Sequence, residues 1–417
     1  MHFFFKKYPF NIKDQDRERH TYIIGASGSG KSELLKYIFH EQGTRKDKKS
    51  SIVLIDPHGD LAEEISQFKD FDPSRLVIFD PTLFKGYTPI FNPFDIDTTD
   101  PQSIEVATSQ FIKTFKDTIK GGDSVSSNME VFLNPIISTL YRKKGADFRD
   151  FRDFLDEETN AHLVEFGGQT SNEGHRIFFE KYVNDKSYKV TREALLKKVQ
   201  ELLNSQTFVN ITTGESTVKL SKLINENYII IFNLSKQNLG EDISSIIGRL
   251  IIAQVQAIAM RRKGDKRPTT HVFIDEFQNY VSDSIKTVLT EARKYGLHFT
   301  LAQQNRGQEM NKKIEDIVLG NTKIKIQGLI DDNVKGVIND SDKIKLKTGE
   351  FLIKITGKDK VKITVPKTYL GTKNSLKKDE YKQLQEQQKG VYYKPTHQRN
   401  SEETRQTGGE YKAKYDL

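Results

Sequence analysis

One eight-residue segment near the start of the chain restricts its possible folds more than any other feature. Residues 25–32 read GASGSGKS and match the pattern G-x-x-x-x-G-K-[ST] at every fixed position. An apolar run over 21–24 precedes the segment, and an amphipathic helical pattern over 32–41 follows it. Glycines let the backbone N–H groups of such a loop face phosphate groups, and the dipole of the following helix adds positive potential. The segment therefore predicts a P-loop between a strand and a helix.

The last two residues of this motif have separate expected roles in binding a nucleotide. Lys31 would reach the β- and γ-phosphates, and the Ser32 hydroxyl would coordinate Mg²⁺. A glycine-rich turn that only caps a helix is the alternative, and the strand–loop–helix context argues against it. The predicted nucleotide-binding residues are Gly25, Ala26, Ser27, Gly28, Ser29, Gly30, Lys31 and Ser32.

A second apolar run, 271–274, ends in two adjacent carboxylates, Asp275 and Glu276. Asp275 would hold Mg²⁺ through water, and Glu276 would orient and polarise the attacking water. A solvated acidic strand end is the alternative, and the motif gains weight only because a P-loop precedes it. Adjacent carboxylates favour hydrolysis over transfer to another substrate.

Two further residues are candidates for the catalytic site. The run 298–302 is followed by Gln303 and Gln304, so the Gln304 amide could sense the γ-phosphate at the carboxyl edge of the sheet. A polar strand end explains Gln304 equally well. Arg293 would lie at the end of a helix over 282–295, where its guanidinium could complete a neighbouring subunit's site. From spacing alone, a cation compensating the helix C-terminus is the better interpretation of Arg293.

Short apolar runs alternate with helical patterns through much of the chain, which indicates an α/β fold with a mostly parallel sheet. Runs of this kind are typical of strands buried on both faces. After residue 322, two or three alternating strands are expected, with a hairpin near Gly357. Before residue 322, the apolar runs predicted to be core strands are 21–25, 51–56, 76–80, 228–234, 271–275 and 298–302.

Between residue 100 and about residue 206 the apolar residues change to helical spacing, which predicts an all-helical insertion in the core. The expected domains are therefore a first core segment over 1–99, the helical insertion over 100–225 and a second core segment over 226–370. The Lys/Glu/Gln-rich remainder, 371–417, is expected to be a charged tail that is mobile or binds a partner.

Composition excludes several classes of protein and permits others. The chain has no cysteine, so disulfide scaffolds, thiolate zinc sites and cysteine nucleophiles are ruled out. Its 65 basic and 57 acidic residues give a net charge of +8, which permits a nucleic-acid partner without requiring one. The most apolar stretch, 243–260, contains Arg249 and three further interrupting residues, so no intrinsic membrane span and a cytoplasmic location are expected.

Together the motifs resemble the HerA/FtsK superfamily of DNA-pumping ATPases, and most of all the TraG/TraD-like coupling proteins of conjugation and type IV secretion. In order and spacing they cover roughly residues 16–330, and the helical insertion falls where such coupling proteins carry an all-helical domain. The segments that carry the resemblance are RHTYIIGASGSGKS at 19–32, IDPHGDL at 55–61, FNPF at 91–94, NLSK at 233–236, GED at 240–242, IDEFQ at 274–278, EARKYGL at 291–297 and LAQQ at 301–304.

The resemblance implies a RecA-like core that forms hexameric rings around DNA and pumps it with ATP. It implies ATP and Mg²⁺ as cofactors, Asp275 and Glu276 as the Walker B pair, Gln304 as a sensor glutamine and Arg293 as a trans-acting arginine finger. Lys31 and Ser32 match the phosphate and Mg²⁺ residues of the family. Asp56, His58 and Asp60 would shape the turn after the second strand rather than hold a metal.

The implied function is an ATP-driven, ring-forming translocase of double-stranded DNA in conjugative or related DNA transfer. Its partners would be DNA, further copies in a homo-hexamer and a secretion channel, relaxase or effector protein that could recruit it to the membrane. One alternative is a nucleotide-gated ring that scaffolds an effector, as in defence systems, and another is a DNA-packaging ATPase. The basic loops 263–267 and 343–347 are candidate DNA-facing segments.

Overall fold

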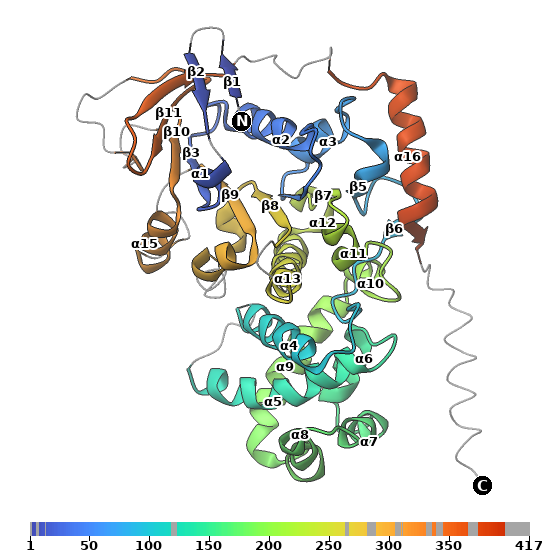
Figure 1. The fold of residues 1–417 in the computed structure, drawn as a ribbon. Helices are drawn as coiled ribbons and strands as arrows, with labels where there is room; N and C mark the ends of the chain where they lie inside the picture. Colours follow the sequence, from blue (N-terminus) through green and yellow to red (C-terminus); the bar gives the residue numbers. More distant parts are fainter. Residues whose placement is uncertain are drawn as a thin grey trace.

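The computed structural model describes most of the chain and places it in two parts, a sheet with its covering helices and a separate group of helices (Figure 1). The described residues are 2–5, 8–12, 14–117, 123–262, 267–281, 289–304, 310, 312–330, 336–338, 345–365 and 374–396. Residues 263–266 and 343–344 of the two basic loops lie outside this set.

The sheet has nine strands in the order β12-β11-β10-β3-β9-β8-β4-β7-β5. The seven strands from β10 to β5 are parallel, and β11 and β12 continue the sheet as an antiparallel hairpin closed over 356–360. Their bounds are β3 Thr21–Ile24, β4 Ser50–Asp56, β5 Leu76–Phe79, β7 Ile229–Asn233, β8 Thr269–Ile274, β9 Leu297–Gln303, β10 Ile324–Gln327, β11 Glu350–Ile355 and β12 Val361–Thr364. The predicted α/β fold with a mostly parallel sheet is confirmed.

Both faces of this sheet are covered, which explains why its strands read as continuous apolar runs. Side chains alternate between the faces: Val53 and Ile55 pack into one apolar cluster, while Ile52 and Leu54 pack into the other. The second cluster includes helices α2 (Lys31–Gly43) and α3 (Asp60–Ser66), and the first includes α13 (Glu241–Met260) and α15 (Lys312–Asn321).

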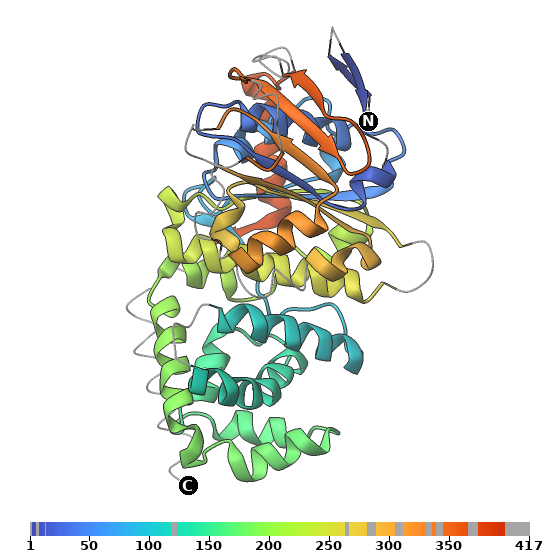
Figure 2. The same cartoon turned by 90° about the vertical axis from the view of Figure 1, so that its left-hand side faces the viewer.

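Helix α13 is long and apolar enough to cross a membrane, judged by length and composition alone. It is the one helix among the described residues that passes this test, with a mean hydropathy of 1.6 over its most apolar window. In the structure, 72% of that window is buried inside the protein. The helix lies between the sheet and α4 (Pro101–Lys116), as Figure 2 shows. We therefore interpret α13 as the central core helix of this molecule.

The described residues between β6 (Tyr87–Pro89) and β7 form helices and connecting turns. The helices from α4 to α9 make up the lower part of the molecule in Figure 1, whereas α10 and α11 lie beside the sheet. The predicted all-helical insertion is confirmed. Its helices are α4, α5 (Asp123–Arg142), α6 (Phe148–Leu155), α7 (Ala161–Gly168), α8 (Glu173–Ile177), α9 (Lys189–Leu203), α10 (Gln206–Thr212) and α11 (Leu220–Asn225), with the short turns η2 (Phe178–Tyr182) and η3 (Lys186–Tyr188).

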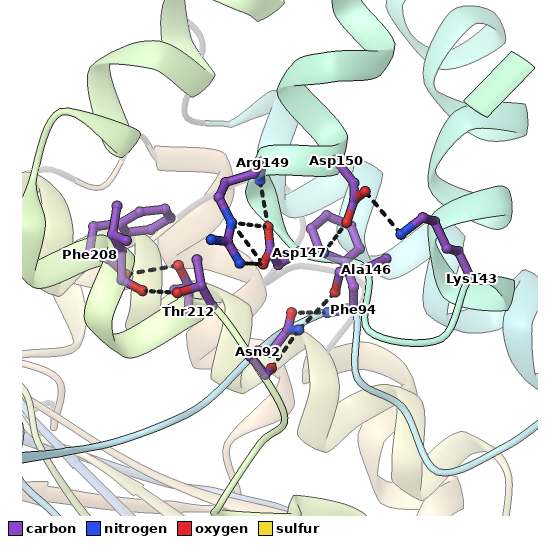
Figure 3. A network of polar contacts seen from close by, with 12 residues as sticks. Asn92, Phe94, Lys143, Ala146, Asp147, Arg149, Asp150, Phe208 and Thr212 are labelled. Carbon is purple, nitrogen blue, oxygen red and sulfur yellow. Dashed lines mark hydrogen bonds and ion pairs between the residues drawn. The ribbon is translucent and has the colours of Figure 1, made fainter. Parts of the chain in front are cut away.

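Asn92 ties the chain that enters this insertion to two of its connecting turns (Figure 3). Its side-chain Nδ2 donates hydrogen bonds to the carbonyls of Ala146, at 2.8 Å, and Gly214, at 3.0 Å. Its Oδ1 accepts from the backbone N–H of Phe94 at 3.0 Å. The side chain is almost fully buried, so these bonds satisfy groups that water does not reach. Asn92 therefore ties the chain entering the insertion to the α5–α6 turn and to the α10–α11 connection.

The described part of the predicted tail, 374–396, is not a mobile segment, and the expectation for it needs correction. It forms helix α16 (Lys378–Tyr392) and strand β13 (Tyr393–Pro395), and β13 pairs with β6. Helix α16 lies along β5, which is an edge strand of the sheet. The Gln388 amide accepts from Ile78 N at 3.0 Å and donates to Leu76 O at 2.8 Å. The Tyr393 hydroxyl also donates to Ile78 O at 2.9 Å, so polar side chains bond to the free edge of β5. The polar composition of this segment therefore gave no sign that it docks on the sheet.

The remaining short elements complete the chain order. They are the antiparallel hairpin of β1 (His2–Phe5) and β2 (Tyr8–Asn11), then α1 (Asp14–Arg17), η1 (Pro73–Arg75), α12 (Lys236–Leu239), η4 (Phe277–Tyr280) and η5 (Ala292–Tyr295).

Candidate active site

The loop between β3 and α2 has the backbone conformation that its glycines permit. Gly28 has φ 77° and Gly30 has φ 92°, both in the left-handed region that other residues rarely adopt. Gly30 also lies close to Gly349, since a Cβ added to Gly30 would come within 3.2 Å of the Gly349 backbone. The loop therefore needs glycine at position 30 for its conformation and for its packing.

A second layer of backbone supports the loop from the strands that follow. Gly349 N donates to Ser29 O at 2.8 Å, and Ala26 N donates to Leu329 O at 2.8 Å. A Cβ on Gly328 would meet the Phe351 ring at 2.7 Å, so this glycine also permits a close approach. We did not predict these supporting residues. The sequence signal for them was a glycine next to each of two strands, Gly328 after β10 and Gly349 before β11.

The order of three parallel strands brings the acidic residues after β8 close to the P-loop after β3. In the sheet, β9 lies between β3 and β8, with Ile24 paired to Gln303 and Ile274 paired to Leu301. Because all three strands run in the same direction, the residues after them meet at one edge of the sheet. The structure thus brings Lys31, Asp275, Glu276 and Gln304 together.

Lys31 and Glu276 make the closest contact in this group. Lys31 Nζ lies 2.6 Å from Glu276 Oε1 and 3.8 Å from Asp275 Oδ1. All three side chains are nearly fully buried. Glu276 itself has φ 45° and ψ 53°, a left-handed conformation that costs a residue other than glycine about 1 kcal/mol or more. Strain of this kind is typical of functional positions.

Two amides also donate to the Glu276 carboxylate. Gln304 Nε2 lies 3.0 Å from Oε1, and Gln278 Nε2 lies 2.6 Å from Oε2. Gln304 was predicted to lie at this edge, but no role was assigned to Gln278. Its position two residues after Glu276, in the turn η4, could have suggested that it reaches back to the carboxylate. Both carboxylate oxygens of Glu276 are therefore held by donors.

The two adjacent carboxyl groups have opposite pKa shifts. Burial raises the pKa of Asp275 to about 6, and the Lys31 ammonium only partly opposes this rise. Burial also acts to raise the pKa of Glu276, but the charge of Lys31 and the hydrogen bonds from Lys31, Gln278 and Gln304 outweigh it, so the pKa of Glu276 is lowered. Glu276 is thus the firmly ionised member of the pair.

The site has the donors expected for nucleotide phosphates with Mg²⁺. Asp275 Oδ1 and Ser29 Oγ are buried and have no hydrogen-bond partner, so each is available to a ligand. Ser32 is exposed in the first turn of α2. Hydroxyl and carboxylate oxygens suit Mg²⁺, which usually takes few protein ligands and completes its shell with phosphates and water. Among the described residues, no group of three His, Cys, Asp or Glu is placed to hold a metal ion.

Asp56 has a structural role that agrees with our prediction for the turn after the second core strand. Its Oδ1 accepts from His58 N and its Oδ2 from Ala62 N, each at 2.9 Å. These bonds shape the connection between β4 and α3. Burial raises the pKa of Asp56, and the backbone donors oppose that rise.

Arg293 is the one predicted site residue that does not join the others. Residues 282–288 of the predicted helix lie outside the described set, and its described end, 289–295, closes in the turn η5 just before β9. Gln304 follows the other end of β9, a seven-residue strand that spans about 20 Å. Arg293 is exposed at the amino edge of the sheet and cannot reach the P-loop of its own chain.

Comparisons with known proteins agree with this geometry. Residues 7–255, more than half of the chain, match the family described as "Helicase HerA, central domain". No curated protein sequence matches the chain.

Solved structures of other proteins share the fold. The plasmid coupling protein TrwB in complex with the ATP analogue ADPNP is 14% identical, with a TM-score of 0.64 over 87% of this chain and 88% of that one. The unbound conjugative coupling protein TrwBdeltaN70 is 15% identical, with a TM-score of 0.61 over 89% of each chain. VirB4 of Thermoanaerobacter pseudethanolicus is 14% identical, with a TM-score of 0.53 over 84% and 90%. At these identities the likeness establishes the fold, which is that of a RecA-like P-loop ATPase.

Proposed function

This chain belongs to the family of the HerA helicase central domain, and we propose that it is a Mg²⁺-dependent ATP hydrolase that drives DNA through a ring of its own copies. The observation that carries the proposal is the meeting of Lys31, Glu276 and Gln304 beside the P-loop. The complex of TrwB with an ATP analogue supports ATP as the nucleotide.

In this proposal each residue of the site acts on the triphosphate or on the attacking water. The P-loop N–H groups hold the phosphates, and Lys31 moves from Glu276 to the β- and γ-phosphates. The departure of Lys31 frees a lone pair on Glu276 Oε1 that can orient and polarise a water molecule, while Gln278 and Gln304 keep the carboxylate in position. Ser32 and, through water, Asp275 would hold Mg²⁺, and the bound ion would supply positive charge that offsets the charge on the phosphates.

The position of Arg293 supports assembly into a ring, with a hexamer as the proposed form. The exposed Arg293 guanidinium is about one strand length from its own P-loop, so it is out of reach of its own subunit's phosphates but accessible to another subunit. An arginine supplied in trans stabilises the charge that spreads over the transferred phosphoryl group. Each subunit would then complete the site of its neighbour.

Likeness to conjugative coupling proteins supports DNA as the substrate and conjugative or related transfer as the process. We propose that the protein works in the cytoplasm on double-stranded DNA and is recruited to a membrane channel by a partner protein.

The decisive experiment measures the ATPase rate against double-stranded DNA concentration at low and moderate salt. Glu276→Gln provides the inactive control, and single-stranded DNA tests the strand preference. We expect saturable stimulation that weakens with salt, because phosphate contacts release counterions. A measurable rate that is indifferent to DNA would refute the motor and favour the nucleotide-gated scaffold.

The trans role of Arg293 is tested by mixing subunits. Arg293→Ala protein is mixed with Glu276→Gln protein at constant total concentration, and the DNA-stimulated rate is recorded. If Arg293 acts between subunits, mixed rings regain activity that neither variant has alone, because an intact Glu276 site then lies beside an intact Arg293. No recovery on mixing would remove the finger assignment without affecting the assignment of the P-loop.

A further inference from the structure

His20 is a buried titratable residue with no role in the chemistry described so far. It precedes β3, the strand that leads into the P-loop, and has φ 61°, in the left-handed region. Only 1% of its surface is exposed. A histidine held in a disfavoured conformation inside the core indicates that its ring has a specific structural use.

The imidazole ring of His20 contacts two separate backbone segments. Its Nδ1 accepts from Phe299 N at 3.0 Å, and its Nε2 lies 3.1 Å from Leu289 O. An amide N–H can only donate and a carbonyl can only accept, so the proton must be on Nε2. Burial lowers the pKa of His20 to about 4, and the charge of Arg293 adds to this effect. The ring is therefore neutral, with one tautomer fixed by its partners.

These contacts place His20 at the start of the turn that carries Arg293. Leu289 lies four residues before Arg293, which is about one helical turn, and its side chain is buried. The other end of this turn is held by Arg262, whose Nη1 donates to Tyr295 O at 3.2 Å. Arg293 itself is exposed between the two anchors. The charged residue thus has free access to a neighbour while its backbone is fixed at both ends.

We propose that His20 is a positioning residue for Arg293, linking the arginine turn to the phosphate-binding strand of the same subunit. The link is short, because only the four residues of β3 separate His20 from the P-loop. The His20 ring therefore fixes the position of the Leu289 carbonyl relative to the strand that leads into the P-loop. The inference rests on the proposed function, since it takes Arg293 to act on the neighbouring subunit.

Two substitutions separate the contacts of the ring. His20→Gln can place an amide nitrogen near Nε2 and keep the donor to Leu289 O. His20→Asn can place an amide oxygen near Nδ1 and keep only the acceptor for Phe299 N, and asparagine tolerates the left-handed conformation well. Both side chains are neutral and polar, so each serves as the folding control for the other, with melting temperatures measured for both.

The assay is DNA-stimulated ATP hydrolysis by homogeneous assemblies of each variant. We expect His20→Asn to lower kcat about ten-fold, a fraction of the ~10³-fold that loss of an arginine finger costs, with the KM for ATP nearly unchanged. His20→Gln should retain most of kcat. Equal losses in the two variants would overturn the proposal, because the donor to Leu289 would then have no special importance.

A double variant tests whether His20 acts through Arg293. If it does, His20→Asn combined with Arg293→Ala should be no slower than Arg293→Ala alone. Losses that multiply would show an independent effect and overturn the proposal.

Hydrogen exchange separates failure of this inference from failure of the proposed function. We would compare the amide protons of residues 289–296 in the two His20 variants. Faster exchange in His20→Asn than in His20→Gln supports the positioning role even if subunit mixing shows that Arg293 has no trans effect. Equal exchange in the two variants overturns it.

Discussion

Replacing Asp275 by asparagine should make the nucleotide-free protein more stable while abolishing hydrolysis, and the equivalent exchange at Glu276 should make it less stable. The two carboxyl groups are adjacent in sequence and share the Lys31 ammonium, yet their surroundings differ. Asp275 Oδ1 is buried without a hydrogen-bond partner, whereas the Glu276 carboxylate accepts from Lys31, Gln278 and Gln304. Ionisation is therefore unfavourable at Asp275 and favourable at Glu276.

The size of the effect at Asp275 follows from its pKa. A rise from the ordinary 3.8 to about 6 costs the ionised form about 3 kcal/mol at neutral pH, since one pKa unit corresponds to about 1.4 kcal/mol. Asparagine removes this cost at nearly constant volume, but its amide is also buried with few partners. We therefore expect Asp275→Asn to gain about 1–2 kcal/mol. Glu276→Gln breaks a buried ion pair and should lose about 3 kcal/mol.

The pH dependence of this gain has a definite sign. The folded-state pKa of Asp275 lies above the unfolded value, so its ionisation destabilises the protein above pH 6. As the pH falls from about 6 to about 4, the wild-type protein should regain stability relative to Asp275→Asn. The advantage of the variant should accordingly be largest at pH 7–8 and should disappear near pH 4.

The assay is urea denaturation of nucleotide-free protein in a chelator, followed by far-UV circular dichroism because the chain has no tryptophan. Asp316→Asn is the matched control, since Asp316 is exposed on α15 and its exchange should change stability by less than about 0.5 kcal/mol. The reasoning is refuted if Asp275→Asn is less stable than wild type at pH 7.5, or if both site variants shift in the same direction.

Three further predictions concern other buried contacts. Asn92→Ala should cost about 2–3 kcal/mol, because the carbonyls of Ala146 and Gly214 lose a buried donor; the urea midpoint measures this, and an unchanged midpoint would contradict it. The folded-state pKa of His20 is about 4, against an ordinary value of 6.5, so the protein should lose about 3 kcal/mol of stability as the pH falls from 6.5 to 4. A pH titration of the urea midpoint measures this loss, and His20→Gln should not show it. Gln388→Ala should expose the edge of β5 and increase light scattering on incubation, whereas Gln387→Ala, at an exposed position on the same helix, should not; equal scattering would disprove the edge role.

Local chemistry in the sequence was sufficient to predict the core elements and the loop that binds phosphate. Strands buried on both faces leave continuous apolar runs, and the P-loop requires glycine where φ is positive. These signals depend only on neighbours along the chain. The acidic residues after β8 were likewise predicted because they end an apolar strand.

The motifs placed these residues in one predicted site, but only the tertiary structure decided which of their atoms meet. The contact between Lys31 and Glu276 joins positions 245 residues apart, and it exists because β9 lies between β3 and β8 in the sheet. Strand order depends on long-range packing, which leaves no periodic trace in the sequence. The same reason applies to α16, whose polar sequence conceals one buried glutamine on the edge of β5. It applies also to His20, because the atoms that fix its tautomer lie more than 260 residues away along the chain.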